Sequence, residues 1–98
     1  MSVYMVLEIS VKDSATYAKY VERAPATIEE YGGRYLVRGG DITSMEGGWN
    51  PERVVILEFP TLELLEKWYR SPEYQELALL RAAATESRSF VVEGYEPS

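Results

Sequence analysis

The sequence predicts an α+β domain in which helices cover one face of a four-stranded antiparallel sheet. Three observations support this prediction. Apolar residues alternate with polar ones in a strand pattern at residues 3–11, and a β-rich segment ends the chain at residues 87–95. Helical apolar spacing follows the first strand and precedes the last. Between these helices lie two further extended segments, separated by a glycine-rich stretch.

The length, composition and net charge of the chain limit both its size and its chemistry. Ninety-eight residues suit a single domain, 1–98, with one core. A net charge of −6, without a basic stripe, argues against a nucleic-acid partner. The longest apolar runs are far shorter than the roughly 18–20 residues of a membrane span, so no membrane association is expected.

Cysteine and histidine are both absent from the sequence. Their absence removes the thiolate nucleophile, the usual zinc and haem ligands and the commonest general base. We therefore expect no metal and no cofactor, and any chemistry must come from carboxylates, Tyr, Lys, Arg or Ser. A reducing cytoplasm suits such a chain.

The first helix is expected to begin at a cap formed by Asp13 or Ser14 and to end at Gly32 or Gly33. Its apolar stripe consists of Tyr17, Tyr20, Val21, Ala24, Ile28 and Tyr31. Pro25 lies inside this pattern, where a proline removes a backbone hydrogen bond and costs about 3 kcal/mol. We therefore expect a kink or a break near Ala24.

The stretch from Tyr31 to Gly40 has two Gly-Gly pairs that bracket a short strand. Simple alternation places Arg34, Leu36 and Arg38 on one face of that strand, and Tyr35 and Val37 on the other. The second glycine pair predicts a bulge, followed by a further extended segment at residues 41–46. Residues 47–51 are expected to form a turn.

The rest of the chain gives clear boundaries. Residues 53–59 are nearly all apolar, which is typical of a central strand buried on both faces. Pro60 stops this strand, and Thr61 caps the next helix. Ser71 and Pro72 start another helix that reaches about Thr85, and the last strand spans about 87–95.

The resulting order is the split βαβ, or ferredoxin-like, arrangement. One sheet face then lacks a helical cover. That face is expected to be too apolar for water and too polar for a dry core. Its apolar residues are Val6, Leu36, Val54 and Ile56, and its charged residues are Glu8, Arg34, Arg38 and Glu58. A second copy of the same sheet would cover it, so we expect a homodimer.

Four separated blocks carry a family resemblance: YGGRYLVRGG, EGGWNPER, LEFPT and WYRSPEY. In these blocks the chain resembles the bacterial domain of unknown function 1330 family, part of the dimeric α/β-barrel superfamily. The resemblance covers about residues 3–95. It implies a homodimer whose two sheets face each other and enclose a cavity in each protomer, and it supplies no reaction. The positions it marks are Tyr31, Gly32, Gly33, Arg34, Tyr35, Arg38, Gly39, Gly40, Trp49, Glu58, Phe59, Trp68, Ser71, Pro72, Tyr74 and Arg81.

The first candidate site residues are Arg38 and Glu58. On adjacent strands of a hairpin they could share one face, where an arginine beside a carboxylate holds an anion or tunes the pKa of the acid. The alternative is a cross-strand ion pair at the dimer interface. Arg34 could likewise contact a ligand, or it could pair with an acidic residue of a helix or lie at the dimer seam.

Three aromatic or acidic residues complete the candidates. Trp49 could close a pocket from its glycine-rich turn or anchor the loop on a partner subunit. Tyr74 could direct its hydroxyl into a cavity or lie in the core. Glu8 could face the same side as Glu58 and form a carboxylate pair for acid–base work, or both could be solvated strand positions.

Two functions remain open at this stage. The first is a domain that binds a small, potentially anionic molecule in a cavity between sheet and helices or between sheets, with cofactor-independent catalysis as one form of it. The second is a non-catalytic structural or regulatory dimer. A solvent-reaching cavity lined by charged residues separates the two.

Overall fold

The computed structural model describes residues 1–97 and contains four strands and three helices. In chain order these are β1 (Val3–Val11), α1 (Ser14–Glu30), β2 (Arg34–Arg38), β3 (Arg53–Phe59), α2 (Leu62–Arg70), α3 (Pro72–Ala84) and β4 (Thr85–Glu93). The strands form one sheet in the order β2-β3-β1-β4, and every neighbouring pair is antiparallel. This confirms the ferredoxin-like arrangement predicted from the sequence.

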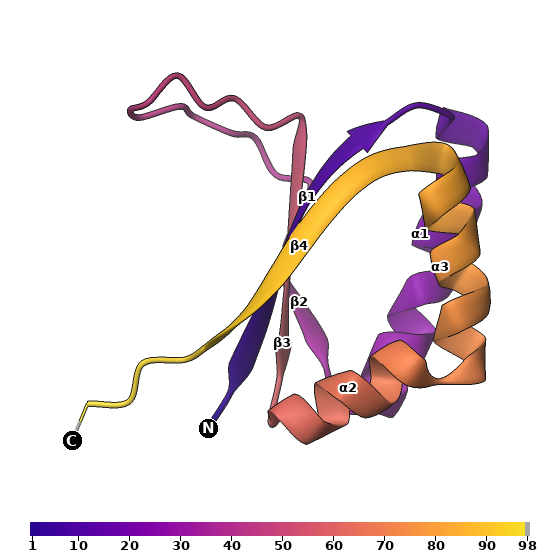
Figure 1. Cartoon of the computed structure of the whole chain (residues 1–98), viewed down its shortest axis with the longest axis vertical. Coiled ribbons are helices and arrows are strands. Elements are labelled where there is room, and N and C mark those ends of the chain that lie inside the picture. Colours follow the sequence, from indigo (N-terminus) through magenta and orange to yellow (C-terminus); the bar gives the residue numbers. More distant parts are fainter. Residues whose placement is uncertain (98) are drawn as a thin grey trace.

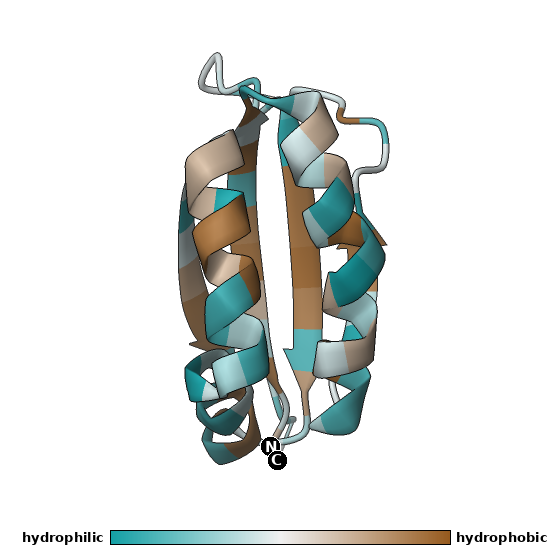
Figure 2. Cartoon of the chain, turned by 90° about the vertical axis from the view of Figure 1, so that its right-hand side faces the viewer, coloured by the Kyte–Doolittle hydropathy of each residue, from teal (hydrophilic) through white to brown (hydrophobic). Residues whose placement is uncertain are grey.

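All three helices lie on the same side of the sheet (Figure 1). Helices α1 and α3 run side by side over the strands, with hydrophobic strand segments behind them (Figure 2). Burial follows the alternation of β1, in which Val3, Met5, Leu7 and Ile9 point toward the helices and are at most 4% exposed. The core therefore lies between the helices and one face of the sheet.

Helix α1 begins where the sequence predicted, because Asp13 caps it by accepting a hydrogen bond from the backbone N–H of Thr16. It ends at Tyr31 and Gly32, and Gly32 has the positive φ of +81° that favours glycine. Of the kink or break expected near Ala24, the break does not occur, since the helix runs unbroken from Ser14 to Glu30 with Pro25 inside it. Tyr20 and Ile28, on either side of the proline, are both buried in the core as expected.

Strand β2 departs from simple alternation. Arg34 and Tyr35 pair with Glu58 and Leu57, but the register shifts between Tyr35 and Val37. One extra residue in a strand turns every later side chain to the opposite face. Arg34 and Arg38 therefore lie on opposite faces, and the expectation that they share one face is wrong. The bulge lies within the strand and not at Gly39 and Gly40.

Residues 39–52 form a long connection between β2 and β3, on the side of the sheet away from the helices (Figure 1). The extended segment expected at residues 41–46 is not a strand, since these residues are exposed and pair with no strand among residues 1–97. Gly47 and Gly48 form the expected turn, with φ of +80° and +63°.

Helices α2 and α3 start at the predicted caps. Thr61 accepts from the N–H of Leu64, and Ser71 accepts from the N–H of Tyr74 with Pro72 at the first helical position. Trp68 of α2 is fully buried and packs its ring 5.2 Å from that of Phe59. Strand β4 starts at Thr85, two residues earlier than expected, because it follows α3 directly.

Candidate functional site

The sheet face away from the helices, called here the open face, combines apolar and charged side chains. By strand register it carries Tyr4, Val6, Glu8, Ser10, Arg34, Val37, Val54, Ile56, Glu58, Glu86, Arg88, Phe90 and Val92. Phe90 and Val92 are 58% and 49% exposed. Strand β3 is central, as expected, but only its helix-facing residues are buried. The open face therefore exposes large apolar side chains among its charged ones in the single chain.

Glu8 is the centre of one charged cluster on the open face. It lies opposite Arg88 in the β1–β4 register, and Arg88 Nε donates to Glu8 Oε1 over 2.5 Å. Trp49, from the long loop, donates its indole N–H to Glu8 Oε2 over 2.8 Å. The Trp49 and Arg88 hydrogen bonds lower the pKa of Glu8, so the residue is a carboxylate at neutral pH. The hydrogen bond from Trp49 to Glu8 holds the long loop over the sheet.

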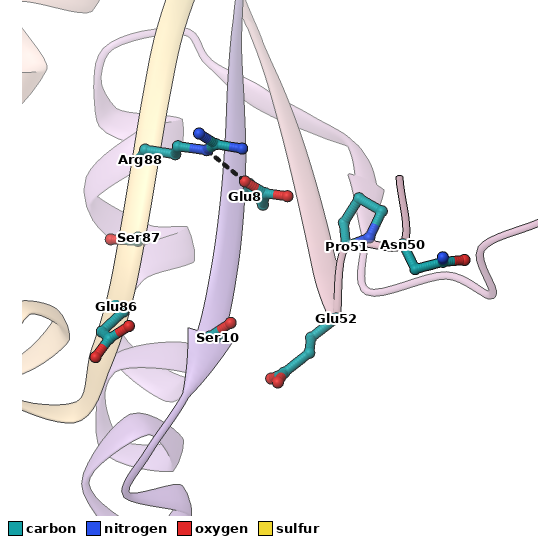
Figure 3. A pocket seen from close by; sticks show the side chains of 8 residues that line it. All are labelled: Glu8, Ser10, Asn50, Pro51, Glu52, Glu86, Ser87 and Arg88. Carbon is teal, nitrogen blue, oxygen red and sulfur yellow. Dashed lines mark hydrogen bonds and ion pairs between the residues drawn. The ribbon is translucent and has the colours of Figure 1, made fainter. Parts of the chain in front are cut away.

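A cavity of about 350 Å³ lies beneath Trp49. Its lining is Val6, Leu7, Glu8, Trp49, Val54, Arg88, Ser89 and Phe90. A second hollow of about 380 Å³ adjoins it and shares Glu8 and Arg88 (Figure 3). The Glu8–Arg88 pair thus stands between an apolar hollow and a polar one. Both volumes fall within the range of small-molecule sites.

A second charged cluster surrounds Glu58. Arg34 Nε donates to Glu58 Oε1 over 2.6 Å, and the hydroxyl of Tyr4 donates to Glu58 Oε2 over 3.2 Å. The hydrogen bond from Arg34 is the main reason that the pKa of Glu58 is lowered. Glu8 and Glu58 both lie on the open face, but they are far apart along the strands. Glu8 pairs with Val54, which lies four residues before Glu58 on β3. They therefore do not form the carboxylate pair considered for acid–base work.

Arg38 does not meet Glu58, so the predicted Arg38–Glu58 pair is wrong. The bulge in β2 turns Arg38 toward the helices, where it lies 4.7 Å from the ring centroid of Tyr35 and donates to the backbone carbonyl of Val21 over 2.7 Å. Arg34 takes the place beside Glu58 that the sequence assigned to Arg38.

Tyr74 is fully buried, and its hydroxyl lies 2.8 Å from the hydroxyl of Tyr20. Burial is the main reason that the pKa of each tyrosine is raised, so both hydroxyls stay protonated. Tyr74 thus takes the core alternative in this chain. The nearby gap between sheet and helix, lined among others by Tyr17, Tyr35 and Arg38, measures only about 10 Å³, which is room for about one water molecule.

Of the six candidates, Glu8, Trp49, Arg34 and Glu58 reach the open face, whereas Arg38 and Tyr74 lie on the helix side. Sequence reasoning missed Arg88 and Phe90 as cavity residues. Alternation along the last strand, with Arg88 and Phe90 two residues apart, could have placed both on one face. No group of acidic, histidine or cysteine side chains among residues 1–97 could hold a metal ion. Within the same residues, no helix is long and apolar enough to cross a membrane.

These features define a ferredoxin-like α+β domain with a mixed apolar and charged open face. The sequence profile of a domain of unknown function, DUF1330, matches residues 2–95, and the chain belongs to this family. Comparison with curated proteins found no match.

Solved structures with the same fold include proteins of known and unknown function. RPA0582, of unknown function from Rhodopseudomonas palustris, superimposes with a TM-score of 0.82 at 21% identity, over 98% of this chain and 84% of that one. SnoaB, a cofactor-independent oxygenase from Streptomyces nogalater, gives 0.71 at 14% identity, over 98% and 95%. A dimeric ferredoxin-like protein of unknown function from Jannaschia sp. CCS1 gives 0.67 at 12% identity, over 96% and 100%.

Proposed function

We propose that the protein is a homodimer that binds a small molecule in the cavity beneath Trp49. The observation that carries this proposal is the cavity itself, about 350 Å³ of space with two aromatic side chains and the Glu8–Arg88 pair in its lining. Apolar walls with a few placed polar groups are the usual features of a ligand site. The gap between the sheet and the helices measures only about 10 Å³ and is too small for a ligand, so we place the ligand on the open face.

The exposed apolar residues of the open face support the dimer. A second open face would remove these apolar side chains from water. They are the exposed Phe90, Val92 and Val37 and the partly buried Val6, Val54 and Ile56. A ferredoxin-like protein with a similar fold is described as dimeric, which also supports a homodimer. Each copy would then enclose its own cavity. We further propose a cytoplasmic location, which a chain without cysteine suits.

Light scattering and a matched pair of variants test the dimer. Phe90→Lys places a charge in the centre of the open face and should give a monomer. Leu79→Lys makes the same change at a 73% exposed residue of α3, on the helix side, and should leave the dimer intact. A wild-type protein that is monomeric at micromolar concentration would remove this part of the proposal.

A thermal-shift screen tests the cavity, because a ligand that binds only the native state raises the apparent melting temperature. Compounds that stabilise the wild type should lose their effect in Trp49→Ala. In Leu79→Ala, which also removes an exposed apolar side chain, they should keep it. Turnover of a stabilising compound without added cofactor would extend the proposal to a cofactor-independent enzyme.

A structural or regulatory dimer is the second candidate. The Arg34–Glu58 and Glu8–Arg88 pairs favour it, because charges within an apolar interface can fix the register of two sheets. This candidate predicts a stable dimer in which the charged residues govern assembly and no compound of the screen acts through Trp49.

A further inference from the structure

The long loop between β2 and β3 is firmly attached at its start. The backbone N–H of Gly39 donates to the carbonyl of Val54 over 3.0 Å, and the guanidinium of Arg53 lies against Gly39. Arg53 is in turn held by α1, because its Nε donates to the hydroxyl of Tyr17 over 3.1 Å. The path of the loop is therefore fixed as far as Gly39, and any movement begins after it.

Beyond Gly39, one hydrogen bond holds the loop over the sheet. Among residues 1–97, the 2.8 Å bond from the Trp49 indole N–H to Glu8 Oε2 is the only one that joins residues 40–50 to the rest of the chain. Trp49 is 60% exposed, so little buried surface adds to this bond. The two preceding residues, Gly47 and Gly48, have positive φ, and a Cβ on either would meet nothing within 4 Å. Such a pair can change its backbone angles at little steric cost.

Glu8 is held in place from its other side. Arg88 Nε donates to Glu8 Oε1 while Trp49 uses Oε2, so one carboxylate joins β4, β1 and the loop. Glu8 and Trp49 both line the cavity of about 350 Å³, together with Val54, which pairs with Glu8 in the strand register. The bond between Glu8 and Trp49 therefore lies at the wall of the cavity itself.

We propose that Trp49 is a lid over this cavity, and that its hydrogen bond to Glu8 is the latch that keeps the lid closed. The inference rests on the proposed small-molecule site and adds how a ligand enters and leaves it. Breaking one hydrogen bond, with rotation at Gly47 and Gly48, lifts the indole ring from the sheet while the strands stay paired. Loops that close over ligand sites move on local hinges of this kind.

A lid has a kinetic signature that a simple wall contact lacks. The latch involves no ligand atom, so it acts alike on the empty and the occupied cavity. Because a ligand passes only while the lid is open, a weaker latch raises the association and dissociation rate constants by the same factor and leaves the Kd almost unchanged. A contact that only stabilises the bound ligand would change the dissociation rate alone.

Stopped-flow fluorescence with N-phenyl-1-naphthylamine, a neutral aromatic probe that brightens in apolar surroundings, measures both rate constants. Trp49→Phe keeps an aromatic ring but removes the N–H donor. In this variant we expect both rate constants to rise about tenfold, which corresponds to a hydrogen bond worth about 1.4 kcal/mol. Unchanged rate constants, or a rise in dissociation alone, would overturn the lid.

Two further variants separate the latch from other effects of the substitution. Glu8→Gln weakens the acceptor, so it should raise both rate constants by a smaller factor, and it should change little once Trp49→Phe has removed the donor. Glu29→Gln makes the same charge change on the exposed side of α1 and should leave both rate constants at the wild-type values. Additive effects of Trp49→Phe and Glu8→Gln would contradict a shared latch and overturn the proposal.

A measurement without ligand tests the latch itself. The chain has no cysteine, so Met45→Cys, at a residue that is 88% exposed, provides a single site for a nitroxide spin label on the loop. Electron paramagnetic resonance spectra should show a more mobile label when Trp49→Phe is added, and an unchanged one when Glu29→Gln is added. Equal spectra in all three proteins would show that the bond does not hold the loop, and would overturn the inference.

Failure of the lid can be told apart from failure of the proposed function. If a compound stabilises the wild type through Trp49 but the two rate constants do not rise together in Trp49→Phe, the site stands and the lid is wrong. If N-phenyl-1-naphthylamine does not bind, the same rate constants are measured with a stabilising compound from the thermal-shift screen. If no compound acts through Trp49, the cavity is not a ligand site and both proposals fail.

Discussion

Arg38 donates a hydrogen bond from its guanidinium to the backbone carbonyl of Val21, with Nη2 and O 2.7 Å apart. Val21 is four residues before Pro25, so its carbonyl is the one that the missing N–H of Pro25 leaves without its usual helical donor. The bulge in β2 brings Arg38 to this point by turning it toward the helices. A strand side chain thus supplies the hydrogen-bond donor that the helix lacks at Pro25.

This hydrogen bond predicts energetic coupling between Arg38 and Pro25. Arg38→Met should lower the free energy of unfolding by about 1 kcal/mol, the typical net value of an intramolecular hydrogen bond. Pro25→Ala restores the backbone donor, so Arg38→Met should cost little in that background. Chemical denaturation of the wild type, both single variants and the double variant measures the coupling. Strictly additive effects would show that Arg38 does not substitute for the missing donor.

The Arg34–Glu58 pair predicts a pH dependence of stability. The pKa of Glu58 is lowered in the folded protein, chiefly by the hydrogen bond from Arg34, relative to an ordinary value of 4.5. The unfolded state therefore binds a proton more readily than the folded state. The stability from Glu58 is present above pH 4.5 and is lost as the pH falls through the lower, folded pKa.

Arg34→Met should move the pKa of Glu58 back up and reduce this acid-dependent loss. Carbon-13 NMR titration of the Glu58 carboxyl measures its pKa directly, and unfolding free energies at several pH values give the stability. Since Arg34 is largely exposed, the effect should be modest and should shrink at high salt. A Glu58 pKa that is the same in both proteins would contradict the assignment of the shift to Arg34.

Much of the fold could be predicted because its signals are local. The caps at Asp13, Thr61 and Ser71 and the helix end at Gly32 each depend on a few adjacent residues. The β2 face assignment failed because a bulge at an ordinary residue such as Leu36 leaves no mark in the sequence. One inserted position was enough to exchange the roles expected of Arg34 and Arg38.

The candidate site depends on contacts that only the folded chain makes. Glu8 and Arg88 are 80 residues apart and meet through the β1–β4 register. Trp49 was recognisable from its glycine-rich turn, but its bond to Glu8 depends on the path of a 14-residue loop that has no regular structure. Long-range register and loop path are therefore what sequence patterns could not supply here.

The Tyr20–Tyr74 pair predicts a non-additive loss of stability. Tyr74→Phe would leave the Tyr20 hydroxyl buried without its partner and should cost about 1–3 kcal/mol. Removing both hydroxyls leaves neither tyrosine with a buried, unpaired hydroxyl, so the double Phe variant should lose less than the sum of the single variants. Because Tyr74 lies away from the cavity beneath Trp49, Tyr74→Phe should not change probe binding at that cavity. Reduced binding in a fully folded Tyr74→Phe protein would bring this residue back into the site.

Gly33 lies between α1 and β2, at a position with no room for a side chain. A Cβ atom there would come within 2.6 Å of the Phe59 ring and 2.8 Å of a methyl carbon of Ile28, closer than real contacts allow. Both neighbours are buried in the core and cannot move aside without disturbing it.

Gly33→Ala should therefore lower the free energy of unfolding by about 1–3 kcal/mol, the usual cost of overpacking. Gly40→Ala is the matched control, because nothing lies within 4 Å of the added Cβ and its φ is not in the left-handed region. That variant should be neutral or gain up to about 1 kcal/mol from the stiffer unfolded chain. Thermal and urea unfolding of the two variants beside the wild type measure the difference. Equal stability of Gly33→Ala and Gly40→Ala would mean that α1 can move away from Phe59, and that its packing is looser than the structure indicates.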